Sequence, residues 1–136
     1  MFLNASGVQI FDTETGAVKQ LAAVPSIYKQ NGSPLFSHVD FARDLNGDGL
    51  ADLLIPDFAG YRLLINDGTG GFERETLLEM QVEMRLSGDT PRYSQFPAHA
   101  FDANFDGRTD VVFHKDNNFL AYLQQADGSY ASAAES

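Results

Sequence analysis

A nine-residue pattern, D-x-N-x-D-G-x-x-D, occurs twice in this chain and constrains its fold more than any other feature. The two copies begin at Asp44 and Asp102, 58 residues apart. Each copy leads directly into an apolar run with β-strand character, at residues 53–55 and 111–113. Fixed positions that recur with the same downstream pattern indicate a structural repeat.

Each copy places side-chain oxygens at positions 1, 3, 5 and 9, a set that suits a hard cation. Ca²⁺ takes roughly six to eight oxygens at about 2.3–2.6 Å, whereas Mg²⁺ demands octahedral geometry and gives up its waters reluctantly. Gly49, at position 6, permits the positive φ that a tightly curled loop needs. The carbonyl of Leu50, at position 7, can add a backbone oxygen. The side-chain donors are Asp44, Asn46, Asp48 and Asp52 in the first copy and Asp102, Asn104, Asp106 and Asp110 in the second.

Two other interpretations of these loops can be weighed against a calcium site. An EF-hand is excluded, because its loop requires a bidentate Glu at position 12, where this chain has Ile55 and Phe113. A metal-free hairpin stabilised by Asx turns remains open. Such a turn needs only one or two Asp or Asn residues, so four converging oxygens favour Ca²⁺ at two sites. The second loop fits less well, because Phe105 replaces the small residue at position 4.

The segments around the loops predict short strands separated by turns. Segments 25–35 and 84–95 carry prolines and glycines and are expected to be loops. Segment 77–84 holds good helix formers, and we expect an extended strand there, with a short helical turn as the alternative. The other expected strands lie at residues 2–3, 8–11, 17–23, 37–42, 53–55, 61–66, 72–78, 96–101, 111–113, 119–124 and 129–133.

The resulting unit is strand, acidic loop, strand, turn, strand, turn, strand. A four-stranded antiparallel unit repeating at this length is typical of a β-propeller blade. We therefore predict an all-β fold with complete blades at residues 36–83 and 96–134 and a partial blade at residues 1–24. Propellers typically have roughly 4–8 blades, so we expect these blades to belong to a larger propeller.

At these residues the chain resembles the FG-GAP/VCBS repeat family. The hallmark loop and strand read D-L-N-G-D-G-L-A-D-L-L-I at 44–55 and D-A-N-F-D-G-R-T-D-V-V-F at 102–113, and the turn N-D-G-T-G-G-F stands at 66–72. The literal FG and GAP words are absent, and Pro56-Asp57 stands where GAP would follow. The chain is therefore more similar to the bacterial VCBS-type branch than to integrin α propellers.

The resemblance implies a β-propeller with Ca²⁺ in the loop between the first two strands of a blade. It adds the carbonyl of Arg108 to the second ligand set, as the counterpart of Leu50. It also implies a non-catalytic module for interaction or adhesion, located outside the cell, on its surface or in the periplasm, with a protein or carbohydrate partner. Two alternatives stay open: the non-catalytic part of a secreted carbohydrate-active enzyme or toxin, and a sugar-binding lectin.

Composition and motifs exclude several other function classes. A net charge of −10 disfavours nucleic acid and anionic membranes, which require clustered Lys and Arg. No apolar run approaches the length of a membrane span, and the N-terminus lacks the features of a signal peptide. His38, His99 and His114 are too scattered for a zinc site, and no nucleophile elbow is present. Because the blades cannot close into a ring, we expect self-association or packing against the rest of a longer chain.

Overall fold

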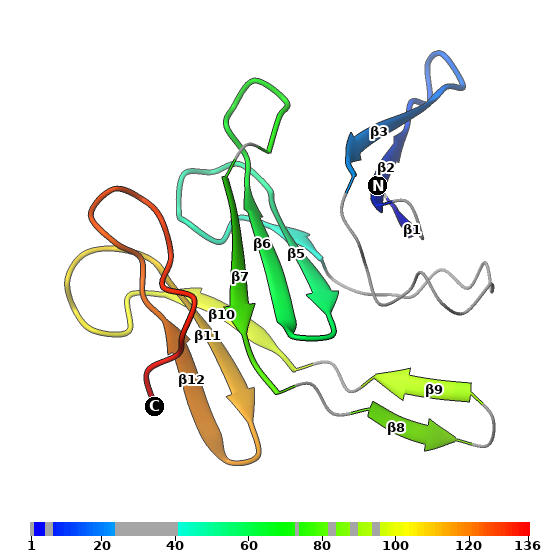
Figure 1. Ribbon diagram of the computed structural model, residues 1–136. Helices are drawn as coiled ribbons and strands as arrows, with labels where there is room; N and C mark the ends of the chain where they lie inside the picture. Colours follow the sequence, from blue (N-terminus) through cyan, green and yellow to red (C-terminus); the bar gives the residue numbers. More distant parts are fainter. Residues whose placement is uncertain are drawn as a thin grey trace.

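The computed structural model describes residues 2–4, 7–23, 41–72, 74–81, 84–87, 90–93 and 96–136. These residues form twelve short strands in antiparallel sheets and contain no helix (Figure 1). Consequently, no helix able to cross a membrane is found among them. The predicted all-β fold is confirmed.

The strands form three larger sheets and one separate hairpin. The first sheet has the order β1-β2-β3, the second β4-β5-β6-β7 and the third β10-β11-β12, while β8 pairs only with β9 among the described residues. The strands are β1 (Phe2–Asn4), β2 (Gly7–Phe11), β3 (Val18–Ala22), β4 (Ala42–Arg43), β5 (Asp52–Asp57), β6 (Gly60–Ile65), β7 (Arg74–Glu79), β8 (Met84–Ser87), β9 (Thr90–Tyr93), β10 (Ala98–Phe101), β11 (Asp110–Lys115) and β12 (Asn118–Tyr122).

The second and third sheets share one hairpin register. The β5–β6 ladder runs from Leu53 opposite Leu64, and the β11–β12 ladder runs from Val111 opposite Tyr122. Both members of the second pair lie 58 residues beyond those of the first. The sequence repeat is therefore also a repeat of strand pairing.

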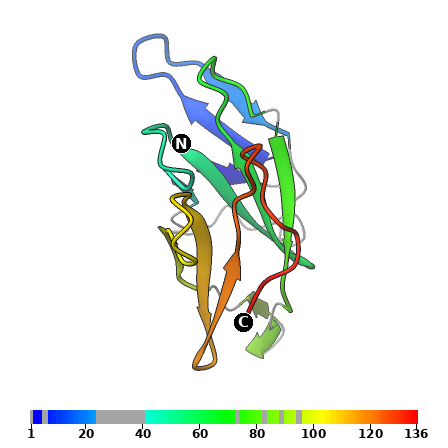
Figure 2. The same ribbon diagram turned by 90° about the vertical axis from the view of Figure 1, so that its left-hand side faces the viewer.

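The side chains of β5 alternate between two apolar cores, one on each face of the second sheet. Leu53 and Ile55 pack with Val8 and Ala22 of the first sheet. Leu54 belongs instead to the cluster shared with the third sheet. The three sheets thus lie against one another in chain order, as Figures 1 and 2 show.

Aromatic rings dominate the core between the second and third sheets. The ring of Tyr61 lies 4.7 Å from that of Phe113, which meets Tyr122 edge-on at 5.8 Å. Such pairs contribute about 0.5–1.5 kcal/mol beyond the burial of their area. The hydroxyl of Tyr61 also accepts a hydrogen bond of 3.1 Å from the amide of Phe96. The interface is therefore fixed by directional contacts as well as by apolar burial.

Three expectations about the strands require correction. Segment 84–95, expected to be a loop, contains the hairpin β8–β9, because Pro91 occupies an edge strand where no ladder N–H is needed. Segment 77–84 is not one strand, since β7 ends at Glu79 and β8 begins at Met84, and its described residues form no helical turn. Segment 129–133 pairs through one isolated bridge, at Tyr130, rather than as a strand. Segment 25–35 and most of the strand expected at 37–42 lie outside the described residues.

Candidate metal centre at two acidic loops

The first acidic loop, residues 44–52, curls around the side chain of Asp44. Its Oδ1 accepts a hydrogen bond of 2.7 Å from the amide of Gly47, and its Oδ2 accepts one of 2.8 Å from the amide of Gly49. Both glycines have positive φ, at 83° and 86°, a region that glycine enters without steric cost. The first residue of the pattern therefore sets the curvature of the loop.

The middle of this loop is a pair of Asx turns. The amide of Asp48 donates to Oδ1 of Asn46 at 3.0 Å, and the amide of Leu50 donates to Oδ1 of Asp48 at 2.8 Å. The two side chains also bond directly, because Nδ2 of Asn46 donates to Oδ2 of Asp48 at 2.8 Å. Oxygens from positions 3 and 5 are thus held next to each other.

The last acidic position, Asp52, is fully buried and joins the loop to the next hairpin. Its Oδ2 accepts from the amide of Leu45 at 2.8 Å and its Oδ1 from the amide of Asn66 at 2.9 Å. The pKa of Asp52 is raised, chiefly by burial and further by the charges of Asp48 and Asp44, although the two amides act to lower it. The carboxylates of this loop therefore repel one another.

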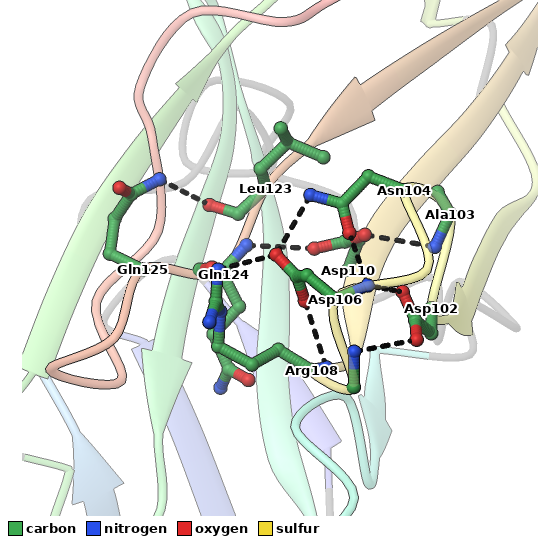
Figure 3. Close-up of polar contacts among 10 residues, drawn as sticks. Asp102, Ala103, Asn104, Asp106, Arg108, Asp110, Leu123, Gln124 and Gln125 are labelled. Atoms are coloured by element: carbon green, nitrogen blue, oxygen red, sulfur yellow. Dashed lines mark hydrogen bonds and ion pairs between the residues drawn. The ribbon is translucent and has the colours of Figure 1, made fainter.

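The second loop, residues 102–110, repeats this bonding pattern, except that Oδ1 of Asp102 accepts from the amide at position 5 instead of position 4 (Figure 3). Asp102 accepts from the amides of Asp106 and Gly107, and Asn104 bonds to Asp106 through both atoms of its amide group. Asp110 is also fully buried and accepts from the amides of Ala103 and Gln124, each at 2.9 Å. Gln124 and Asn66 are 58 residues apart, so the buried carboxylate has the same partners in both repeats.

Phe105 adopts the backbone conformation of the glycine that it replaces. Its φ is 63°, against 83° for Gly47 at the same position of the first loop. The left-handed conformation costs a residue with a side chain about 1–2 kcal/mol, and the ring is 93% exposed, so little packing offsets that cost. The second loop therefore keeps its shape in spite of Phe105.

Arg108 is the clearest chemical difference between the loops, because Leu50 holds its position in the first. Its guanidinium forms an ion pair with Asp106 through Nη2 and donates from Nε to the carbonyl of Gln124 at 2.8 Å. Burial acts to raise the pKa of Asp106, but the side chain of Asn104 and the amide and charge of Arg108 outweigh burial and lower it. A cation in the second loop would compete with this internal positive charge.

The two loops are neighbours, and Tyr130 lies between them. Its hydroxyl is 3.0 Å from the carbonyl of Leu45 in the first loop and 2.9 Å from that of Thr109 in the second. A Cβ on Gly47 would stand 2.9 Å from Oγ1 of Thr109, which shows how closely the loops approach. Burial raises the pKa of Tyr130, and carboxylates of both loops, beginning with Asp52 and Asp110, raise it further. Sequence reasoning missed this residue, because an isolated tyrosine in an alternating segment is typical of a core.

The donor set of each loop suits a hard cation, although its carboxylates are turned toward backbone amides. Both loops supply only oxygen ligands, and each carboxylate oxygen has a second lone pair beyond the one that an amide uses. No three His, Cys, Asp or Glu side chains within the described residues converge on one point. The loops therefore have the geometry of Asx turns. A bound cation would draw the carboxylates inward from these positions.

The fold and the loops together define a class of protein: propeller-type β-repeats, in which a curled acidic loop precedes the hairpin β5–β6 of the second sheet and the hairpin β11–β12 of the third. The FG-GAP-like repeat family matches residues 44–113, half of the chain, from the first acidic loop into β11. The chain belongs to this family, which confirms the resemblance seen in its sequence. Neither the curated proteins nor the solved structures contain a match to it.

Proposed function

We propose that this chain is a calcium-binding β-propeller repeat module with a non-catalytic role in interaction or adhesion. The observation that supports it most is the maintenance of one loop geometry in both repeats. Phe105 takes the strained conformation of Gly47, and Asn104 and Asp106 keep the mutual bonds of their counterparts. A turn that binds no metal could form with less backbone strain. A cation site, in contrast, requires its oxygen donors at these positions.

Calcium would offset the excess negative charge of each loop. Three carboxylates are crowded into nine residues of each loop, and like charges at such range destabilise one another. The ion would be held by Asp44, Asn46, Asp48, Asp52 and the carbonyl of Leu50 in the first loop, and by Asp102, Asn104, Asp106, Asp110 and the carbonyl of Arg108 in the second. This role is structural, because it stiffens the edge of a sheet and activates no bond.

Calorimetric titration with Ca²⁺ tests this proposal directly. We expect the wild type to bind two equivalents, and Asp48→Ala and Asp106→Ala each to lose one. Asp12→Ala is the matched control, because Asp12 lies in an ordinary turn between β2 and β3, where it bonds Glu14 and Thr15. Loss of calcium in the Asp12 variant, or no binding by the wild type, would overturn the proposal.

Arg108 provides a further prediction that separates the two sites. The second site should be weaker, because the guanidinium already neutralises part of the charge of Asp106. Arg108→Leu introduces the residue found at that position in the first loop, and it should strengthen the second site while leaving the first unchanged. Unequal sites that become similar in this variant would support the assignment of ligands, and a weakened second site would contradict it.

The location and partner class of the module follow from chemistry rather than from a pocket. Extracellular calcium modules often have Kd values of about 10⁻⁴–10⁻³ M, and such a site fills only where calcium is abundant. We therefore place the module outside the cell, at its surface or in the periplasm, and expect a protein or carbohydrate partner. A glycan array run with Ca²⁺ and with chelator tests the carbohydrate option, and calcium-dependent binding there would favour a lectin over a protein-binding module.

A further inference from the structure

The hydroxyl of Tyr130 touches both acidic loops. Leu45, whose carbonyl it meets at 3.0 Å, lies between the first two donors of loop one. Thr109, whose carbonyl it meets at 2.9 Å, directly precedes the buried Asp110 of loop two. A hydroxyl carries a single proton, so the two carbonyls share one donor and are held toward the same point.

The ring that carries this hydroxyl is firmly anchored, whereas the middle of each loop is exposed. Tyr130 is only 5% exposed and belongs to the core between the second and third sheets, together with Leu45 and Phe113. Tyr130 lies outside both loops in the sequence and forms an isolated bridge with Gln124. The core therefore holds the hydroxyl at a fixed point from which both loops are bonded.

Each bonded carbonyl is adjacent to groups that orient a proposed ligand. The amide of Leu45 donates to Asp52, and the peptide that contains the Leu45 carbonyl leads into Asn46. On the other side, the peptide that contains the Thr109 carbonyl leads into Asp110, whose carboxylate is bonded by Ala103 and Gln124. Turning either peptide would turn the neighbouring donor.

We infer that Tyr130 is a positioning residue shared by the two acidic loops, so that one hydroxyl outside both loops sets the arrangement of the donors in each. The inference rests on the proposed calcium function where it concerns metal affinity. It goes beyond that function by making the two sites depend on a common group. Groups that orient metal ligands typically contribute about 10–100-fold to affinity.

The test compares Tyr130→Phe with Tyr122→Phe. Tyr122 is a matched control, because it is fully buried in the same core and its hydroxyl bonds the carbonyl of Glu79, a strand residue outside both loops. Each variant loses one buried hydroxyl and should lose a similar amount of stability. Two readouts are needed: amide spectra of the metal-free proteins at Gly47 and Gly107, and calorimetric titration with Ca²⁺.

We expect Tyr130→Phe to shift the amide signals of both loops without metal and to weaken calcium binding at both sites about tenfold. Tyr122→Phe should do neither. A response confined to one loop, or equal responses in the two variants, would overturn the inference. If the wild type binds no calcium, the proposed function fails, but the metal-free spectra still decide: shifts in both loops support the shared role, and unchanged loops refute it.

Discussion

Two buried aspartates connect the acidic loops to the sheets that follow them. Asp52 and Asp110 are the only charged side chains among the described residues that are fully buried. Each accepts two backbone N–H groups, one from the start of its own loop and one from a residue just beyond the end of β6 or β12. Both carboxylate oxygens are therefore needed even before a cation is considered.

Asp52→Asn should accordingly destabilise the metal-free protein by about 1–3 kcal/mol. An amide keeps one acceptor, but its NH₂ group must face the N–H of Leu45 or Asn66, which leaves a buried donor unsatisfied. Chemical denaturation in chelator measures the effect. Asp116→Asn is the control: the same change at a left-handed turn position with φ of 49°, where Asn is well tolerated. If both variants unfold at the same denaturant concentration, this role of Asp52 is wrong.

At the level of single elements, the hairpins are fixed by a few turn residues. Gly60 begins β6 with φ of 141°, and a Cβ there would lie 2.0 Å from the carbonyl oxygen of Leu78. Gly70 also has positive φ, at 92°, but nothing lies within 4 Å of its Cβ position. The same residue type is thus required for close packing in one place and for backbone conformation alone in the other.

Gly60→Ala and Gly70→Ala should therefore differ sharply in stability. The first must push β7 away from β6 and should cost more than about 4 kcal/mol, a loss seen only when strain or packing is severe. The second should cost about 1–2 kcal/mol for the left-handed conformation. Thermal or urea unfolding of both variants checks this difference, and similar losses would mean that the β6–β7 contact is looser than the structure shows.

The turns after β6 and β12 share an aspartate whose pKa is lowered. Thr69 bonds Asp67 through its hydroxyl and its amide, and Ser129 bonds Asp127 in the same way. A lowered carboxyl pKa stabilises the fold above the unfolded value of 3.8, and this stabilisation is lost as pH falls through the folded pKa. Thr69→Val should raise the titration midpoint of Asp67 toward 3.8, and carbon NMR can follow it. Asp127 is the internal control and should not move.

The sequence predicts loops and strands well where a local pattern determines them, and poorly where the structure depends on pairing between distant residues. The acidic loops follow from spacing alone, since Asp44 and Asp102 each curl the residues that follow them. The hairpin β8–β9 was missed because Pro91 suggests a loop, although Gly88-Asp89 between two short β-type runs is a hairpin signal. The contact of Tyr130 with both loops joins positions up to 85 residues apart, and no local pattern encodes it. Calcium binding itself stays a prediction.

At the scale of the whole molecule, the third sheet has an exposed face, and the equivalent face of the second sheet is covered by the third. Tyr61, Leu63 and Ile65 pack against the third sheet. The residues 58 positions later, Phe119, Ala121 and Leu123, line a shallow apolar hollow on the outer side of the third sheet. Phe119 is 61% exposed. By the logic of the repeat, this face suits another sheet of the same kind.

We therefore expect a second copy of the chain to cover this face in solution. Association by an apolar patch depends on concentration through mass action, so sedimentation velocity at several concentrations should show an increase in size. Phe119→Ser should weaken association, whereas Phe58→Ser, which alters a ring of similar exposure in the β5–β6 turn, should not. A wild type that stays monomeric at every concentration would contradict the expectation.

The shared register of the two hairpins also has an evolutionary consequence. Alternate residues of β5 serve opposite cores, so the insertion of one residue there would exchange the two faces and disrupt both interfaces. Duplication or loss of a whole 58-residue unit leaves every joint between sheets as it was, because each unit presents the same pair of faces. Chains of this kind can therefore change length by entire repeats, while within a strand they are open to substitution but closed to insertion.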